Sequence, residues 1–178
     1  MSGPHPTRQR TFDQRNRSSA VKLVLDTNVV IDWLVFEDPF LNPFRAGVLE
    51  SRITIVTHQP AIDELRRVLS YPALKLKATR QAEVLLQYQA RTIQPSGSDI
   101  QARQHMEPPA GFPRCRDPDD NHFLVLAWRS RADALVSRDR AVLTLRKRSR
   151  VCGFTILDVQ EMIAIVDTAP SEPHENPT

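Results

Sequence analysis

Residues 21–28 read Val-Lys-Leu-Val-Leu-Asp-Thr-Asn, and this stretch carries the strongest signal for the fold. Its first five residues form a short, mostly apolar run of strand-forming residues, and the run ends at Asp26. A nearly continuous apolar run is typical of a strand covered on both faces, as in a parallel sheet. We therefore predict a buried strand that ends in a carboxylate.

Similar runs and helical patterns follow along the chain. Further strands are predicted at 53–56, 132–136 and 154–157, with helices at 28–36, 40–50, 60–70, 77–90, 118–130, 139–147 and 158–165. Strands that alternate with helices predict an α/β fold with a mainly parallel sheet. Residues 95–116 are rich in proline, glycine and polar residues and form the longest expected loop.

The length of 178 residues suits one domain. We expect that domain to cover 21–166. Residues 1–20 are polar, with four arginines against one aspartate and no apolar periodicity, and are expected to be a disordered basic arm. Residues 167–178 contain three prolines and three acidic residues and are expected to be a disordered tail.

Composition indicates the compartment. The two cysteines, Cys115 and Cys152, form neither a disulfide framework nor a metal-ligand spacing. No apolar run reaches the ~18 residues that a membrane span needs, and the N-terminus lacks the apolar core of a secretory signal. We therefore expect a cytoplasmic protein that does not contact a membrane.

Acidic residues stand where the predicted elements would bring them together. Asp26 ends the first strand, and Asp139 follows the predicted strand 132–136 by three residues. Sites in open parallel sheets form beyond the carboxyl ends of the strands, so two central strands would place these carboxylates close together. On the helix predicted at 60–70, Glu64 lies at the edge of the apolar face and Asp63 points away from it.

The helix predicted at 118–130 begins with a third acidic group. Asp117 suits the N-cap and Pro118 the first helical position. Asp120 lies one turn before Phe123 and Leu124 and therefore over the buried face. An inward-facing carboxylate needs a cationic partner. Helix capping alone is the simpler explanation for Asp117 and Asp119.

A divalent cation would resolve the repulsion between gathered carboxylates. Hard oxygen ligands suit Mg²⁺ or Mn²⁺ better than zinc, and no set of histidines and cysteines competes with them. A metal ion held by carboxylates can activate water and neutralise charge on a phosphoryl group.

Four sequence motifs, taken in order along the chain, resemble those of the PIN-domain family. They are Leu25-Asp26-Thr27-Asn28, Asp63-Glu64-Leu65, Asp117-Pro118-Asp119-Asp120-Asn121 and Ser137-Arg138-Asp139. The resemblance covers about 21–166 and is strongest to the prokaryotic toxin (VapC-like) branch of toxin–antitoxin systems. It implies a Rossmann-like three-layer α/β/α sandwich around a parallel sheet. It further implies an endoribonuclease that cuts single-stranded RNA with Mg²⁺ or Mn²⁺.

The resemblance assigns roles by position. It gives Asp26, Glu64, Asp120 and Asp139 as the catalytic and metal-binding acids, and Asp117 as a further acid that binds the metal directly or through another ligand. Asn28 and Ser137 match polar positions that orient the acids or water. RNA, a cognate antitoxin and a second copy of the chain are the partners that the family leads us to expect.

Basic side chains near the predicted site are candidates for RNA contact. These are Arg114, Arg116, Arg138 and Arg140. A solvated surface is the alternative, since the net charge is only +3. His58 is predicted to be a helix cap or a surface group rather than a ligand, and His105 and His122 are predicted to have structural roles. Trp33 and Trp128 are predicted to lie in the core, and no site role is predicted for the cysteines.

Three other functions compete with this one. A phosphatase of the haloacid-dehalogenase type also begins from an Asp after the first strand, but it needs a second Asp where this chain has Asn28. A non-catalytic PIN-like module that binds RNA or a protein partner is the main alternative, although all four acids are present. DNA is a third alternative, because metal-assisted phosphodiester cleavage does not require the 2′-hydroxyl.

Overall fold

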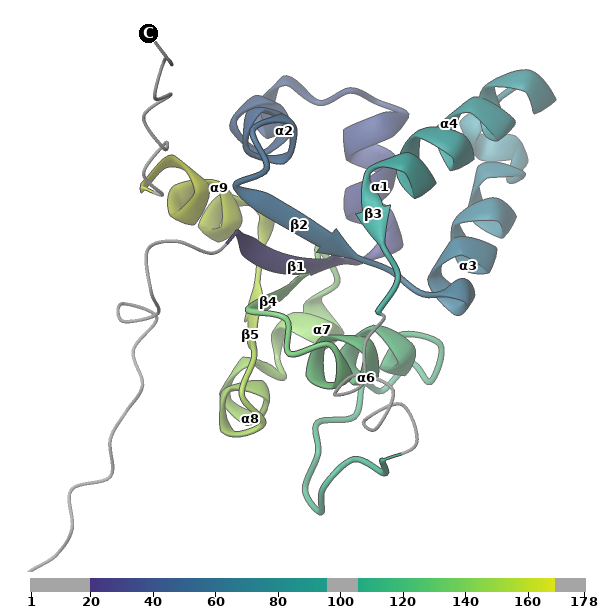
Figure 1. Ribbon diagram of the computed structural model, residues 1–178. Helices are drawn as coiled ribbons and strands as arrows, with labels where there is room; N and C mark the ends of the chain where they lie inside the picture. The colour runs from purple at the N-terminus through teal and green to yellow at the C-terminus, as the bar shows by residue number, and fades with distance from the viewer. Residues whose placement is uncertain (1–19, 96–105, 169–178) are drawn as a thin grey trace, which may run out of the picture.

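The computed structural model describes residues 20–95 and 106–168, and within them five strands form one parallel sheet in the order β3-β2-β1-β4-β5 (Figure 1). The strands are β1 (Val21–Leu25), β2 (Ile53–Val56), β3 (Thr92–Ile93), β4 (Ala134–Val136) and β5 (Thr155–Leu157). All four strand pairs are parallel. The predicted α/β fold is therefore confirmed.

The order of the strands sets the position of the site. β1 lies at the centre, with β2 on one side and β4 on the other, and Leu25 pairs with Val136. The chain builds the sheet outward from β1 to β3 and then returns to place β4 beside β1. Ligands of open α/β sheets bind where the strand order turns in this way. The expectation that Asp26 and Asp139 follow adjacent central strands is confirmed.

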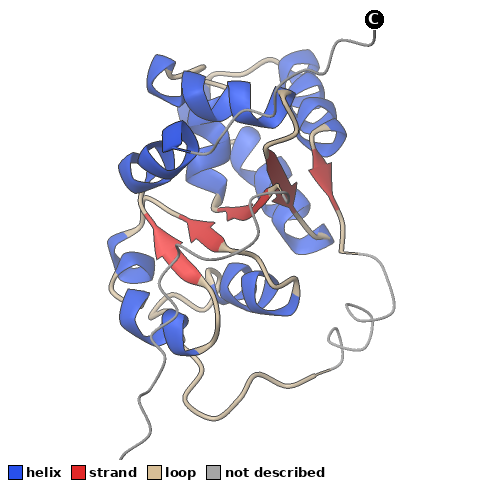
Figure 2. Ribbon diagram, turned by 60° about the vertical axis from the view of Figure 1, so that its left-hand side comes forward, coloured by secondary structure: helices blue, strands red, loops and turns tan. Residues whose placement is uncertain are grey.

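Helices cover both faces of the sheet (Figure 2). Leu23 and Leu25 point to one face, which is covered by five helices. These are α1 (Thr27–Leu34), α2 (Asn42–Leu49), α3 (Gln59–Leu69), α4 (Ala78–Ala90) and α9 (Val159–Thr168). Val24 points to the other face, which is covered by α6 (Asn121–Arg129), α7 (Arg140–Leu143) and α8 (Arg146–Val151). The alternation within β1 fills both cores and gives three layers.

The element boundaries correct several predictions. The strand β3 was missed because its two residues carry no detectable pattern. The predicted helix 40–50 consists of a 3₁₀ turn, η2 (Pro39–Leu41), followed by α2, and a second 3₁₀ turn, η3 (Pro72–Leu74), follows α3. The predicted helix 139–147 is divided into α7 and α8.

The predicted helix 118–130 begins three residues later, at Asn121. The side-chain Nδ2 of Asn121 donates to the backbone carbonyl groups of Asp117 and Pro118, at 3.3 and 3.2 Å. Its side-chain oxygen accepts a hydrogen bond of 2.8 Å from the Cys115 amide. These contacts hold 117–120 as a turn rather than as a first helical turn. The assignment of Asp117 as the N-cap and of Pro118 as the first helical residue was therefore wrong.

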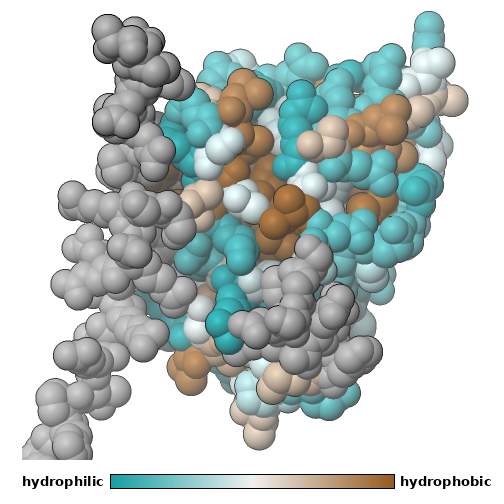
Figure 3. Space-filling view, viewed as in Figure 1, coloured by the Kyte–Doolittle hydropathy of each residue, from teal (hydrophilic) through white to brown (hydrophobic). Residues whose placement is uncertain are grey.

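At the ends of the described chain, α9 continues to Thr168, two residues beyond the predicted end of the domain at 166. Most of the predicted basic arm and acidic tail lies outside the described residues. No helix in the described part of the chain is long and apolar enough to cross a membrane. One face of the molecule is mainly hydrophilic, with separate apolar patches (Figure 3).

Candidate functional site

Asp26 occupies the end of β1 and the N-cap of α1, and its carboxylate is almost fully buried, with 5% exposure. One oxygen accepts a hydrogen bond from the Asn28 backbone amide at 3.0 Å, and the other accepts one from the Ser137 hydroxyl at 2.5 Å. Burial raises the pKa of Asp26. The hydrogen bonds from Ser137 and Asn28 oppose this shift, and the charges of Glu64 and Asp139 add to it.

Ser137 connects Asp26 with Asp139. It follows β4 directly and is fully buried. Its hydroxyl donates to Asp26 and accepts a hydrogen bond of 3.0 Å from the Asp139 amide. The Asp139 carboxylate caps α7 by accepting from the Ala141 amide at 2.5 Å. Of the two predicted orienting residues, Ser137 therefore contacts Asp26 through its side chain and Asn28 through its backbone.

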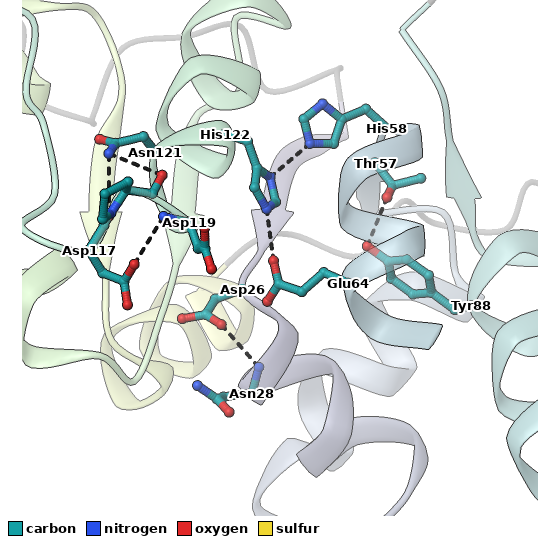
Figure 4. A network of polar contacts seen from close by, with 11 residues as sticks. Asp26, Asn28, Thr57, His58, Glu64, Tyr88, Asp117, Asp119, Asn121 and His122 are labelled. Atoms are coloured by element: carbon teal, nitrogen blue, oxygen red, sulfur yellow. Dashed lines mark hydrogen bonds and ion pairs between the residues drawn. The ribbon is translucent and has the colours of Figure 1, made fainter. Parts of the chain in front are cut away.

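Glu64 approaches Asp26 from α3 and is partly buried (Figure 4). Its Oε2 lies 2.8 Å from Nε2 of His122, and the Thr27 side chain forms a second hydrogen bond to it. Burial acts to raise the pKa of Glu64, but these hydrogen bonds and the nearby positive charges outweigh it, so the pKa is lowered. The neighbouring Asp63 is exposed and pairs with Gln59 and Arg66. The orientation predicted for both residues is confirmed.

The two histidines beside Glu64 were missed as part of the site. Nδ1 of His122 lies 2.9 Å from Nε2 of His58, which precedes α3. Burial, together with His122 and Arg129, lowers the pKa of His58 to about 4. His58 occupies the N-cap position of α3, as one of its two predicted roles required, but its side chain makes no capping bond and contacts His122 instead. The pairing joins residues 64 positions apart, and no spacing within the sequence signals it.

Asp120 enters the site from the N-terminal end of α6. Its Oδ2 lies 3.4 Å from the buried Cys115 thiol. Burial raises the pKa of Asp120 to about 6; the Cys115 contact opposes the shift, and the charges of Asp26, Asp139 and Asp117 add to it. Cys115 therefore contacts a candidate ligand, which corrects the prediction that it has no part in the site.

Asp117 has different surroundings from Asp120. It is exposed, and its carboxylate accepts a hydrogen bond of 3.0 Å from the Asp119 amide within the turn before α6. Its charge still reaches Asp120. The turn therefore places Asp117 at the edge of the acidic group.

The acids influence one another electrostatically, so Asp26, Glu64, Asp120 and Asp139 converge in space. Their hard oxygens match the ligands that Mg²⁺ and Mn²⁺ prefer. As the side chains stand, however, the described residues include no group of three or more His, Cys, Asp or Glu positioned to hold one ion. The donor chemistry of the four acids nevertheless fits a divalent cation.

The four arginines predicted as candidates for RNA contact have different surroundings. Arg138 forms ion pairs with Asp32 on α1 and, at 3.5 Å, with Asp38. The side chains of Arg114, Arg116 and Arg140 are exposed. A surface hollow lies beside Glu64 between α3 and the start of α6, lined by Pro60, Asp63, Glu64, Arg67, Pro118, Asp119 and His122.

Comparison with known proteins gives a relative and a family. An uncharacterized protein of Methanocaldococcus jannaschii is 26% identical over 130 residues, which cover 73% of this chain and 78% of the relative. No solved structure matches the chain significantly. Residues 22–141, more than half of the chain, match the family described as the PIN domain. The matched range includes all four converging acids.

Proposed function

The chain belongs to the PIN-domain family, whose members are typically nucleases, and on this premise we propose that it is an endoribonuclease that cuts single-stranded RNA with Mg²⁺ or Mn²⁺. One observation carries the proposal: four carboxylates from separate elements converge where the strand order turns, and the pKa values of Asp26 and Asp120 are raised there. Gathered carboxylates with perturbed pKa values are typical of sites that bind cations and catalyse reactions.

Asp26, Glu64, Asp120 and Asp139 would hold the ion, and Asp117 is a further candidate ligand. When bound, the ion supplies activation of water and neutralisation of charge on the phosphodiester. The protein contributes orientation, because the Ser137 hydroxyl and the Asn28 amide fix Asp26 before any ligand arrives. Without a cation the carboxylates repel one another, which favours capture of a divalent ion.

The exposed Arg114, Arg116 and Arg140 are proposed to contact RNA phosphates, with Arg138 as a further candidate once it leaves its acidic partners. Such contacts would position an RNA strand over the acids without distinguishing one base sequence from another. They also predict that RNA binding weakens as the salt concentration rises.

A narrower proposal concerns the cellular role: the nuclease is the toxin of a toxin–antitoxin pair, as the resemblance to that branch implies. Induced expression should then arrest the growth of a bacterial host. Expression of an Asp26→Asn variant should not. Normal growth of the host during accumulation of the active protein would remove the toxin role and leave the nuclease proposal standing.

The nuclease proposal is tested by Asp26→Asn. This change removes one negative charge but retains the shape of the side chain and an oxygen that can accept from the Asn28 amide. We expect the variant to fold and to lose almost all cleavage of single-stranded RNA in Mn²⁺, because a neutral amide is a poor metal ligand. Cleavage rates at saturating Mn²⁺ and circular dichroism measure the two effects.

Glu83→Gln is the matched control. Glu83 is an exposed acid on α4 that pairs only weakly with Arg80, at 3.5 Å. The Glu83→Gln variant should retain wild-type activity. Full activity of a folded Asp26→Asn protein would overturn the mechanism. A wild type that binds RNA in Mn²⁺ without cutting it would instead support the non-catalytic alternative.

A further inference from the structure

We propose that His122 is a positioning residue for Glu64 and that His58 fixes the ring of His122, so that the three side chains act as one hydrogen-bonded chain. The expected effect on catalysis rests on the proposed nuclease function. The hydrogen-bonded chain of His58, His122 and Glu64 is a property of the folded protein, so its existence can be tested without measuring cleavage.

The two links of the chain have short and compatible geometry (Figure 4). Nε2 of His122 lies 2.8 Å from Glu64 Oε2, and Nδ1 of His122 lies 2.9 Å from Nε2 of His58. An ionised carboxylate can only accept, so His122 donates through Nε2. The second hydrogen bond joins Nδ1 of His122 to Nε2 of His58, so it fixes the His122 ring at the nitrogen that does not contact Glu64.

The surrounding packing holds the His122 ring in place. It lies against Phe123, with ring centroids 4.0 Å apart, and its centroid is 5.0 Å from that of His58. The side chains of His122 and Glu64 are 23% and 18% exposed, so water has limited access to their contact. The chain therefore connects α6 to α3 at the edge of the acidic group.

This arrangement restricts Glu64 to one orientation. A glutamate on a helix has several rotatable bonds and loses substantial freedom when it is ordered. His122 and Thr27 hold the Glu64 carboxylate beside Asp26 before any ion arrives. Partners that orient a metal ligand typically change metal affinity or activity by about 10–100-fold when they are removed.

Substitutions at His122 separate positioning from packing. His122→Phe retains a flat ring against Phe123 and removes both nitrogens, whereas His122→Gln restores a donor close to the position of Nε2. We expect His122→Phe to weaken Mn²⁺ binding, measured by calorimetry, by about 10–100-fold. We expect it to lower kcat with little change in KM for RNA, and His122→Gln to recover much of both losses. Wild-type Mn²⁺ affinity in a folded His122→Phe protein, or a Gln variant no better than Phe, would overturn the proposal.

A double-mutant cycle tests the outer link. His58→Phe alone should weaken Mn²⁺ binding less than His122→Phe does. In a His122→Phe background it should have no further effect, because residues in one network are not additive. If the effects of the two substitutions on Mn²⁺ binding add, His58 acts independently of His122, and the proposed hydrogen-bonded chain is wrong.

A measurement on the metal-free protein distinguishes failure of this inference from failure of the nuclease proposal. The His122 Nε2 proton should be visible by NMR in the wild type and in Glu83→Gln, because its hydrogen bond to Glu64 slows exchange with water. It should be lost in Glu64→Ala. If this proton signal is absent from the wild type, or if it persists in Glu64→Ala, the inference is wrong. If the wild type neither binds Mn²⁺ nor cuts RNA, the nuclease proposal fails, and this signal still decides whether the chain exists.

Discussion

Single residues that are close in sequence can have very different surroundings, as Asp117 and Asp120 demonstrate. Asp117 is exposed and accepts from the Asp119 amide, whereas Asp120 is partly buried against Cys115 and near the charges of Asp26 and Asp139. Asp117→Asn should retain the turn, because an asparagine side chain accepts the same bond. It should therefore keep substantial cleavage activity, while Asp120→Asn should lose most of it.

Steady-state cleavage rates of the two purified variants at saturating Mn²⁺ measure this difference. The turn before α6 should be intact in both, which circular dichroism and thermal melts can verify. Equal loss of activity in the two variants would mean that Asp117 is also a ligand and that the site uses five acids.

The raised pKa of Asp120 predicts a pH dependence of stability in the metal-free protein. Its pKa is about 6 in the folded state, against an ordinary value of 3.8. Between these values the folded protein holds a proton that the unfolded chain has released, so this contribution to stability is complete below the lower value and is lost as the pH rises through about 6. The buried Asp26 acts in the same direction.

Asp120→Asn should therefore be more stable than the wild type at about pH 7.5, and the difference should shrink as the pH approaches about 4. Because the group is partly exposed, solvent screening reduces the effect to the order of 1 kcal/mol. Thermal melts of both proteins in a chelator across this range test it. A constant difference at all pH values would contradict the assignment to Asp120 ionisation.

At the scale of elements, one hydroxyl joins the ends of two strands. Ser137 follows β4, donates to Asp26 at the end of β1, and accepts from the amide of Asp139, which caps α7. Ser137→Ala removes both contacts and leaves a buried carboxylate with one donor fewer. We expect it to lower the free energy of unfolding by about 1–2 kcal/mol. We expect cleavage activity to fall by about 10–100-fold.

Ser130→Ala is the matched control. Ser130 is equally buried, and its hydroxyl donates to the Leu126 carbonyl within α6 at 2.7 Å, away from the acids. The Ser130→Ala variant should be less stable than the wild type but should retain wild-type cleavage activity. Urea unfolding and cleavage rates of the two variants separate the effects, and equal activities would remove the orienting role of Ser137.

At the scale of the whole molecule, the acids connect ion binding to folding. They come from β1, α3, the start of α6 and the turn after β4, so they converge only when the sheet and its helices are assembled. Mn²⁺ should therefore bind the folded protein in preference to the unfolded chain. At an ion concentration of 100 times Kd the stabilisation would be about 2.7 kcal/mol, which corresponds to an increase in Tm of about 5–10 °C.

The double variant Asp120→Asn/Asp139→Asn should lose this increase in Tm while retaining its fold. Thermal melts with and without Mn²⁺ provide the comparison, and Glu83→Gln again serves as the control. An equal increase in the double variant would place the ion elsewhere on the molecule.

Local patterns in the sequence were sufficient for the class of fold and for part of the site. The apolar run before Asp26 predicted a buried parallel strand, because a strand covered on both faces must be apolar at nearly every position. The helical period predicted that Glu64 faces the protein and Asp63 faces solvent. Both are properties of single elements, and periodicity within one element is enough to reveal them.

Contacts between elements were decided by the tertiary structure alone. Sequence patterns missed β3, whose two residues become a strand only because β2 offers a partner. They placed the start of α6 too early, because the Asn121 side chain turns back to hold 117–120. They also missed the pairing of His122 with Glu64 and His58, and that of Cys115 with Asp120. Hydrogen bonds and burial between packed elements have no period along the chain, so only the folded arrangement of β1, α3, α6 and β4 determines them.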